Sequence, residues 1–84
     1  MKIYIIVDSC SGEDYSADDV GLLLVTTNKD EAKVFFDNEI SNWEDGMTDY
    51  QSNVADWGNL FVYECTDFSG DSHRIMKLIE KEVK

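Results

Sequence analysis

The sequence lacks proline and has only one histidine and two cysteines among its 84 residues. The cysteines, Cys10 and Cys65, belong to no Cys-x-x-Cys or Cys/His spacing, so the pattern predicts reduced thiols and no zinc site. No apolar run approaches the roughly 18 residues of a membrane span, and no basic segment leads into an apolar one after Met1. We therefore expect neither a signal peptide nor a membrane-spanning segment, and a cytoplasmic protein.

Basic residues are scarce, at seven Lys and Arg against eighteen Asp and Glu, which gives a formal net charge of -11. Sixteen of the acids but only three of the bases lie in residues 1–72. Such a charge repels nucleic acid and anionic membranes and attracts basic protein surfaces. We expect no direct nucleic-acid binding and no membrane binding, although acidity also serves solubility alone.

Motifs for catalysis or metal binding are missing as well. The sequence has no Gly-rich phosphate loop, no GxSxG and no HExxH. His73 has no defined partner, and Cys10 has no base assigned to it. The acids near residue 10 offer oxygen ligands for Ca²⁺, but Cys10 and Gly12 stand where an EF-hand loop needs Asp or Asn. We predict no catalytic residue, no metal, no cofactor and no enzymatic activity.

A helix over about 28–44 is the clearest element that the chain contains. Its face repeats at steps of three and four, and five of the six residues on it are apolar: Ala32, Phe35, Phe36, Glu39, Ile40 and Trp43. Thr27 or Asn28 can cap its start, with Asp30 or Glu31 three residues on. The pattern predicts a helix that lays its apolar face against a core.

Strands are predicted at 2–7, 20–26 and 59–66 from β-branched and aromatic residues. Residues 8–19 are expected to form a long acidic hairpin loop, since they carry Ser, Gly and Asp without an apolar period. A short helical turn is expected within 47–57. A C-terminal helix over about 71–83 is predicted from the apolar stripe Ile75, Met76, Leu78, Ile79 and Val83.

The expected order is therefore β-β-α-β-α in a single α+β domain, residues 1–84. A right-handed crossover gives a three-stranded antiparallel sheet with strand order 2-1-3. The main helix covers one face. The C-terminal helix either joins it or covers the other face.

The segments MKIYIIVD and TNKDEAKVFF, with an apolar strand between them, resemble small acidic phage and prophage proteins of the β-β-α-β type, anti-CRISPR-like inhibitors among them. The resemblance covers about residues 1–40 and the strand near 60–66. It implies a phage-encoded inhibitor of host defence or of nucleic-acid enzymes, and some such proteins imitate DNA. The long acidic hairpin loop and the cationic C-terminal helix depart from the pattern.

The acids form two groups that each contain tyrosine. Carboxylates spread over a surface can occupy a basic groove as phosphates do, and aromatic side chains ringed by charge are typical interface anchors. The predicted partner-binding residues are Glu13, Asp14, Tyr15, Asp18 and Asp19 in the hairpin loop, and Glu44, Asp45, Asp49 and Tyr50 after the main helix. We expect a non-enzymatic binding protein that blocks a basic, nucleic-acid-binding protein, such as a CRISPR effector.

Other interpretations remain open. An immunity or antitoxin protein against a cationic nuclease would carry the same charge, and so would an acidic housekeeping phage protein without a nucleic-acid-related target. The bases Arg74, Lys77, Lys81 and Lys84 recur at three and four, so they also allow a homodimer in which one copy's basic stripe meets the other's acidic face. We prefer the simpler interpretation, an ordinary solvated helix face with (i, i+4) pairing.

Overall fold

The structure, a computed structural model, describes residues 1–12, 15–68 and 72–83, with the backbone alone at 11, 12 and 15–20. These residues form one antiparallel sheet of five strands and one helix. In chain order the elements are β1 (Lys2–Gly12), β2 (Tyr15–Thr26), α1 (Lys29–Glu44), β3 (Tyr50–Asp56), β4 (Leu60–Asp67) and β5 (Ser72–Glu82).

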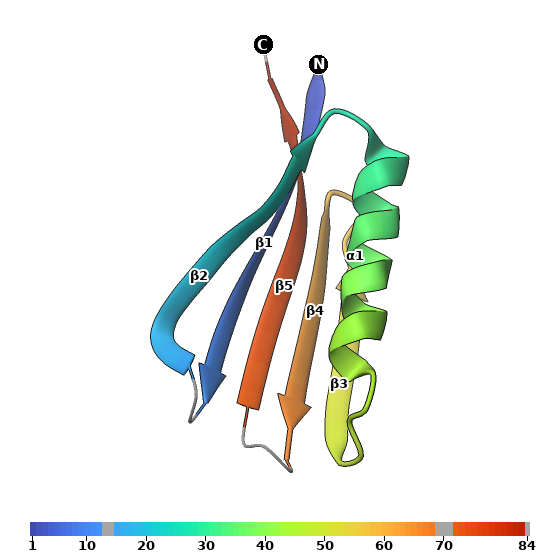
Figure 1. Ribbon diagram of the computed structural model, residues 1–84. Coiled ribbons are helices and arrows are strands. Elements are labelled where there is room, and N and C mark those ends of the chain that lie inside the picture. Colours follow the sequence, from blue (N-terminus) through green and yellow to red (C-terminus); the bar gives the residue numbers. More distant parts are fainter. Residues whose placement is uncertain (13–14, 69–71, 84) are drawn as a thin grey trace.

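The strand order is β2-β1-β5-β4-β3, so β5 lies in the middle of the sheet (Figure 1). The predicted three-stranded sheet with order 2-1-3 and two helices is therefore wrong. The first strand does lie between two others, but its second neighbour is β5. The end of α1 and the start of β3 lie at the same end of the sheet as the end of β1, and the termini lie at the opposite end (Figure 1).

The segment predicted as a C-terminal helix is β5, which pairs with β1 from His73 to Glu82 and with β4 along most of its length. Its apolar residues sit on both faces: Met76 and Leu78 face the helix, and Ile75 and Ile79 face the other side of the sheet. A helical stripe and a strand therefore fit the apolar residues equally well, namely Ile75, Met76, Leu78 and Ile79. Pairing with two neighbouring strands makes this segment a strand.

Two further expectations are wrong for related reasons. The predicted helical turn within 47–57 is the edge strand β3, in which Tyr50 and Val54 share a face by alternation. The predicted loop at 8–19 is mostly strand, since β1 reaches Gly12 and β2 begins at Tyr15. The strands predicted at 2–7 and 20–26 thus extend further into the hairpin than expected, to eleven and twelve residues.

The helix prediction is confirmed. Asn28 is the N-cap of α1, and its side-chain oxygen accepts a hydrogen bond from the Glu31 backbone N–H at 3.1 Å. Ala32 and Phe36 are fully buried one turn apart, so this face of the helix lies on the sheet. Asp30 and Glu31 occupy the first turn, where the helix dipole favours negative charge.

The core lies between α1 and one face of the sheet. The Phe36 and Phe61 rings meet at 6.4 Å between centroids, and the Lys33 ammonium lies 5.1 Å from the Phe61 ring centre. The fully buried side chains come from α1 and from β1, β4 and β5 alike. They are Ile6, Ala32, Phe36, Tyr63, Cys65 and Met76.

The opposite face of the sheet, which we call the open face, is covered by no helix in the described part of the chain. Residues opposite one another in antiparallel strands point to the same side, so the pairing identifies its members. Its apolar side chains are Ile3, Ile5, Val7, Leu22, Val25, Ala55, Leu60, Val62, Ile75 and Ile79. Leu22 and Val25 are exposed and the others half-buried.

The only helix in the described residues, α1, is too short and too polar to cross a membrane.

We expect Phe36→Ala to lower the free energy of unfolding by about 3–5 kcal/mol, because it removes a fully buried ring from the helix–sheet contact. Val34→Ala is the matched control, since Val34 lies on the same helix but is exposed, and it should change stability by less than about 0.5 kcal/mol. Urea unfolding followed by circular dichroism measures both. Similar losses in the two variants would contradict this position for the helix.

Candidate functional site

The end of α1 and the start of β3 bring together one of the two predicted acidic groups. Glu44 is the last helical residue, Asp45 is the C-cap, and Asp49 directly precedes β3. Ser52 of β3 donates a hydrogen bond to the Glu44 carboxylate at 3.2 Å, which ties the helix end to the edge strand. We call Glu44, Asp45, Asp49 and the exposed Tyr50 the acidic end.

Electrostatics at the acidic end are unfavourable for the isolated protein. The helix dipole places partial negative charge at the C-terminal turn of α1, and no basic residue lies in that turn. Within the described residues, none of the carboxylates of Glu44, Asp45 and Asp49 forms an ion pair. A cation brought by a partner would relieve both the dipole and the mutual repulsion of these carboxylates.

The other predicted group lies in the β1–β2 hairpin. Glu13 and Asp14 lie outside the described residues, while Tyr15, Asp18 and Asp19 belong to the β2 backbone. Tyr15 pairs with Gly12 and Asp19 with Cys10. The hairpin is at the same end of the sheet as the acidic end, but β2 and β3 are opposite edges, so the two groups are separated by the width of the sheet (Figure 1).

Two neighbours of the acidic end were missed by the sequence reasoning. Asp67 pairs with Tyr50 across β3 and β4, and the Phe68 backbone N–H donates to the Asp49 carbonyl oxygen at 2.8 Å. The Phe68 ring is exposed beside these acids. Because the β3–β4 pairing brings these residues together, no local sequence signal could have identified them.

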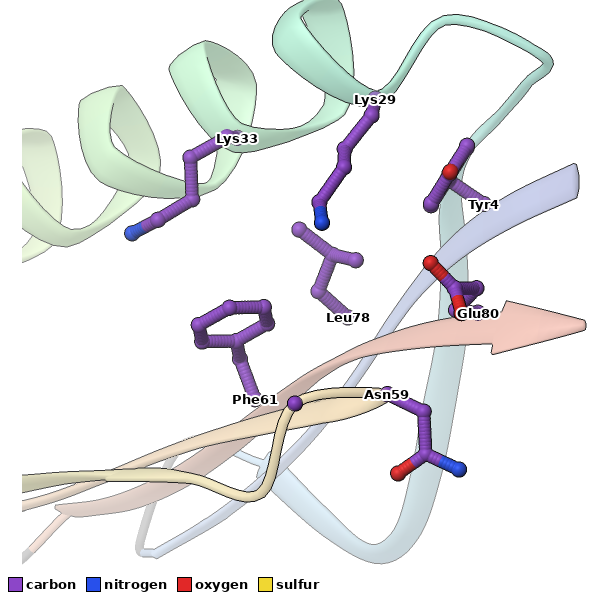
Figure 2. Close-up of a pocket in the computed structure, with 8 residues that line it drawn as sticks. Tyr4, Lys29, Lys33, Asn59, Phe61, Leu78 and Glu80 are labelled. Carbon is purple, nitrogen blue, oxygen red and sulfur yellow. The ribbon is translucent and has the colours of Figure 1, made fainter.

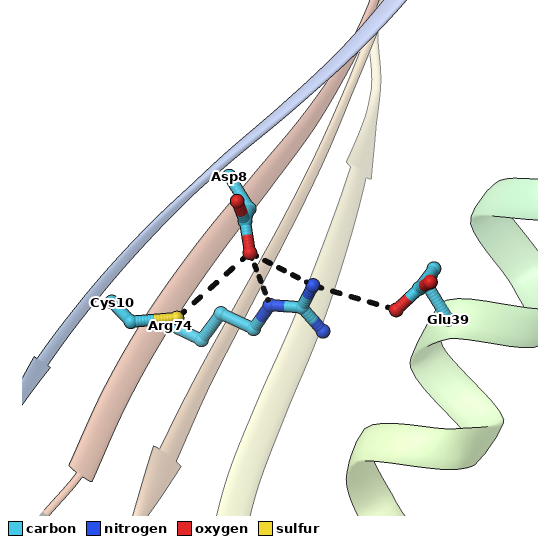
Figure 3. Close-up of polar contacts among 4 residues, drawn as sticks. All are labelled: Asp8, Cys10, Glu39 and Arg74. Carbon is cyan, nitrogen blue, oxygen red and sulfur yellow. Dashed lines mark hydrogen bonds and ion pairs between the residues drawn. The ribbon is translucent and has the colours of Figure 1, made fainter. Parts of the chain in front are cut away.

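A buried ion cluster lies between sheet and helix (Figure 3). The Arg74 guanidinium, 5% exposed, donates to one Asp8 carboxylate oxygen from Nε at 3.1 Å and from a terminal nitrogen at 2.9 Å. The same terminal nitrogen lies 3.5 Å from the Glu39 carboxylate of α1, and the Trp43 ring lies 4.9 Å from the guanidinium carbon. Arg74 thus joins β1, β5 and α1, so it is engaged within the fold.

Gly21 makes room for this cluster. It pairs with Asp8, and a Cβ at this position would come within 2.9 Å of the Asp8 carboxylate. Any larger residue would require the Asp8 carboxylate to shift. The register between β1 and β2 shifts nearby, between Ile6 and Val7.

Tyr63 lies buried beside this cluster, and its hydroxyl has no hydrogen-bond partner among the described residues. Burial raises the pKa of Tyr63 well above its ordinary value, and the neighbouring Cys65 and Glu44 add to this effect. The Trp43 indole N–H is likewise buried without a partner in the part of the chain that the structure describes. Both groups pack as core, so they offer no acid–base chemistry near pH 7.

Other chemistry-bearing residues do not converge. Among the described residues no group of three or more His, Cys, Asp and Glu side chains could hold a metal. His73 Nδ1 lies 3.0 Å from the Thr66 hydroxyl, as in an ordinary cross-strand pair. Cys10 and Cys65 both pair with Arg74, so β5 separates their strands by two spacings of about 4.8 Å, too far for a disulfide within the chain.

A small cavity near the start of α1 is lined by Tyr4, Lys33, Phe61, Leu78 and Glu80 among others (Figure 2). Its volume of about 10 Å³ is close to the space that one water molecule requires. It therefore offers no room for a substrate.

Comparison with protein families, curated proteins and solved structures found no match to this chain.

We expect Arg74→Met to lower the free energy of unfolding by about 3–5 kcal/mol, because it leaves the Asp8 carboxylate buried without its cation. Adding Asp8→Asn should restore much of that loss, since it removes the unpaired charge. Lys77→Met is the control on the same strand, exposed on the opposite face. Strictly additive effects of the two cluster substitutions in urea unfolding would contradict this coupling.

The raised pKa of Tyr63 predicts alkaline destabilisation. In the unfolded chain Tyr63 ionises near pH 10, whereas burial keeps it protonated in the folded protein at that pH. The unfolded state then binds fewer protons than the folded state. The contribution of Tyr63 to the free energy of unfolding is therefore fully present below pH 10 and is lost as the pH rises above it. Tyr63→Phe should weaken this fall at little cost at pH 7, because the hydroxyl has no partner.

Unfolding by urea between pH 7 and 11 measures this dependence. Tyr4, whose pKa is also raised by burial, should leave a residual slope in the variant. An unchanged slope in Tyr63→Phe would show that other groups cause the alkaline loss.

Proposed function

We propose that the protein is a non-enzymatic inhibitor that binds a basic protein surface through the acidic end. One observation supports this most directly: three carboxylates gather at a helix C-terminus without an ion pair among the described residues, next to exposed Tyr50. Folding alone disfavours Glu44 and Asp45 at this helix end, since the dipole of α1 repels negative charge there. A partner's lysines and arginines supply the missing cations.

The class of partner follows from this chemistry. A surface that binds nucleic acid carries lysine and arginine spaced to contact phosphates, and carboxylates compete for them by the same electrostatics. The proposed target is therefore a nucleic-acid-binding host protein, such as a CRISPR effector, blocked by a phage-encoded protein in the host cytoplasm. Tyr50 and Phe68, both exposed aromatics, serve as anchors within the charged surface.

The test uses a triple variant of the acidic end, Glu44→Lys, Asp45→Lys and Asp49→Lys. We expect it to lose capture of the partner from nuclease-treated host lysate, whereas the unmodified chain retains the partner at low salt and releases it at high salt. Added DNA or RNA duplex should displace the partner as well. The same substitutions should preserve or slightly raise thermal stability, by about 0.3–1 kcal/mol for a favourable charge at the helix end.

A matched control changes the net charge equally at the other end of the sheet. Asp30→Lys, Asp56→Lys and Glu82→Lys all replace exposed acids near the start of α1, the end of β3 and the end of β5. This control should retain more partner than the triple variant does. Equal loss in both would assign the attraction to net charge, and equal retention would refute a role for the acidic end.

A further inference from the structure

The open face is an unpartnered apolar surface in the middle of a strongly acidic protein. Its aliphatic side chains come from all five strands, and Leu22 and Val25 remain 66% and 53% exposed. An uncovered apolar area that spans a whole sheet is typical of an interaction surface. Nothing in the acidic end or in its proposed partner accounts for it.

Charge is distributed unequally between the two sides of the sheet. Among the side chains that the structure describes, the open face carries one acid, Glu64, and two bases, Lys77 and Lys81. The remaining described acids belong to α1, to the connections or to the helix-covered side. Each copy has a net charge of -11, so two copies repel one another least when their open faces meet.

The size of the open face suits a stable interface. The five strands are seven to twelve residues long and extend about 33 Å on average, and together they span about 20 Å, so the face offers about 650 Å². A specific protein–protein interface buries about 800 Å² on each partner. Sheets that pack face to face by interleaving aliphatic side chains form sandwiches of this kind.

From these features we infer that the open face binds a second copy of this chain, so that two sheets form a two-fold symmetric sandwich with both helices outside. This interface differs from the homodimer that the sequence suggested, because Lys77 and Lys81 lie on a strand beside aliphatic residues. The acidic ends remain uncovered, so the dimer goes beyond the proposed inhibition and does not depend on it.

Lys77 and Glu64 make the face self-complementary. Val62 pairs with Lys77 and Glu64 with Ile75, so the two charged residues are diagonal neighbours on β4 and β5. Both are exposed, and they form no ion pair with each other within the chain. When the two-fold axis of the dimer passes between them, Lys77 of each copy lies opposite Glu64 of the other copy, as an isologous interface requires.

Two open hollows lie beside this pair on the surface. One hollow of about 290 Å³ is lined by Val7, Ser9, Ile75 and Lys77 among others. A second, of about 210 Å³, is lined by Asn53, Glu64 and Thr66 among others. The hollows adjoin the two members of the charged pair, so each copy's charged side chain has a recess to enter.

The test is the mass of the full chain in solution, measured by sedimentation equilibrium up to about 1 mM protein, where association free energies near -4 kcal/mol become visible. We expect a dimer that tightens as salt screens the net repulsion, the reverse of the salt dependence expected for the basic partner. A monomer at every concentration and salt would overturn the proposal.

Charge variants test the geometry. Lys77→Glu alone gives two acids at the pair and Glu64→Lys alone gives two bases, so each variant should be at least tenfold weaker as a homodimer. Mixed together they should form a heterodimer, because both cross-pairs then have opposite charges. Circular dichroism checks that each variant folds.

The matched control is Val34→Lys, which places a charge on the exposed side of α1 and should leave the dimer unchanged. The triple variant of the acidic end should also still dimerise, which separates this proposal from the proposed function. A dimer that ignores both charge variants, or a mixture that associates no better than its components, would exclude the open face as the interface. If the chain stayed monomeric and bound only an added acidic protein, that protein and not a second copy would be the occupant of the open face.

Discussion

One helix cannot cover both faces of a five-stranded sheet, and the rest of this structure depends on that constraint. The sixteen residues of α1 place their apolar stripe against one side, where Ile6, Tyr63 and Met76 complete the core. The aliphatic residues of the other side remain half-exposed. A small domain buries a limited share of its surface, so leaving one face uncovered costs it a large part of the available stabilisation.

Charge follows the same division. The helix side carries most of the described acids, and its one buried cation, Arg74, is engaged by Asp8 and Glu39. The unpaired carboxylates near Glu44 weaken the helix, while the buried cluster fixes the helix against β1 and β5. The charges that fix the helix and those that weaken its end thus lie less than two turns apart on α1.

The helix could be predicted from sequence because its evidence is local. The cap at Asn28 and the repeat that includes Ala32 and Phe36 need no knowledge of distant residues. β5 could not, because a central strand with Ile75 and Met76 on opposite faces has the composition of an amphipathic helix. Only pairing with β1, more than sixty residues earlier in the chain, distinguishes the two.

The candidate site divides in the same way. The sequence places Glu44, Asp45 and Asp49 together because they follow one helix end. It could not place Asp67 beside Tyr50, since that contact requires the register of β3 on β4. The charged pair on the open face was likewise hidden, because Lys77 was assigned to a helix.

The position of β5 also bears on how the chain folds. It is the last strand in sequence and the middle one in the sheet, so the hairpins β1–β2 and β3–β4 have no common neighbour until β5 arrives. Contacts of such long sequence separation close slowly and leave strand edges open meanwhile. Until β5 is made, no strand joins the two hairpins, and the negative charge that both carry disfavours their pairing with each other and with other copies.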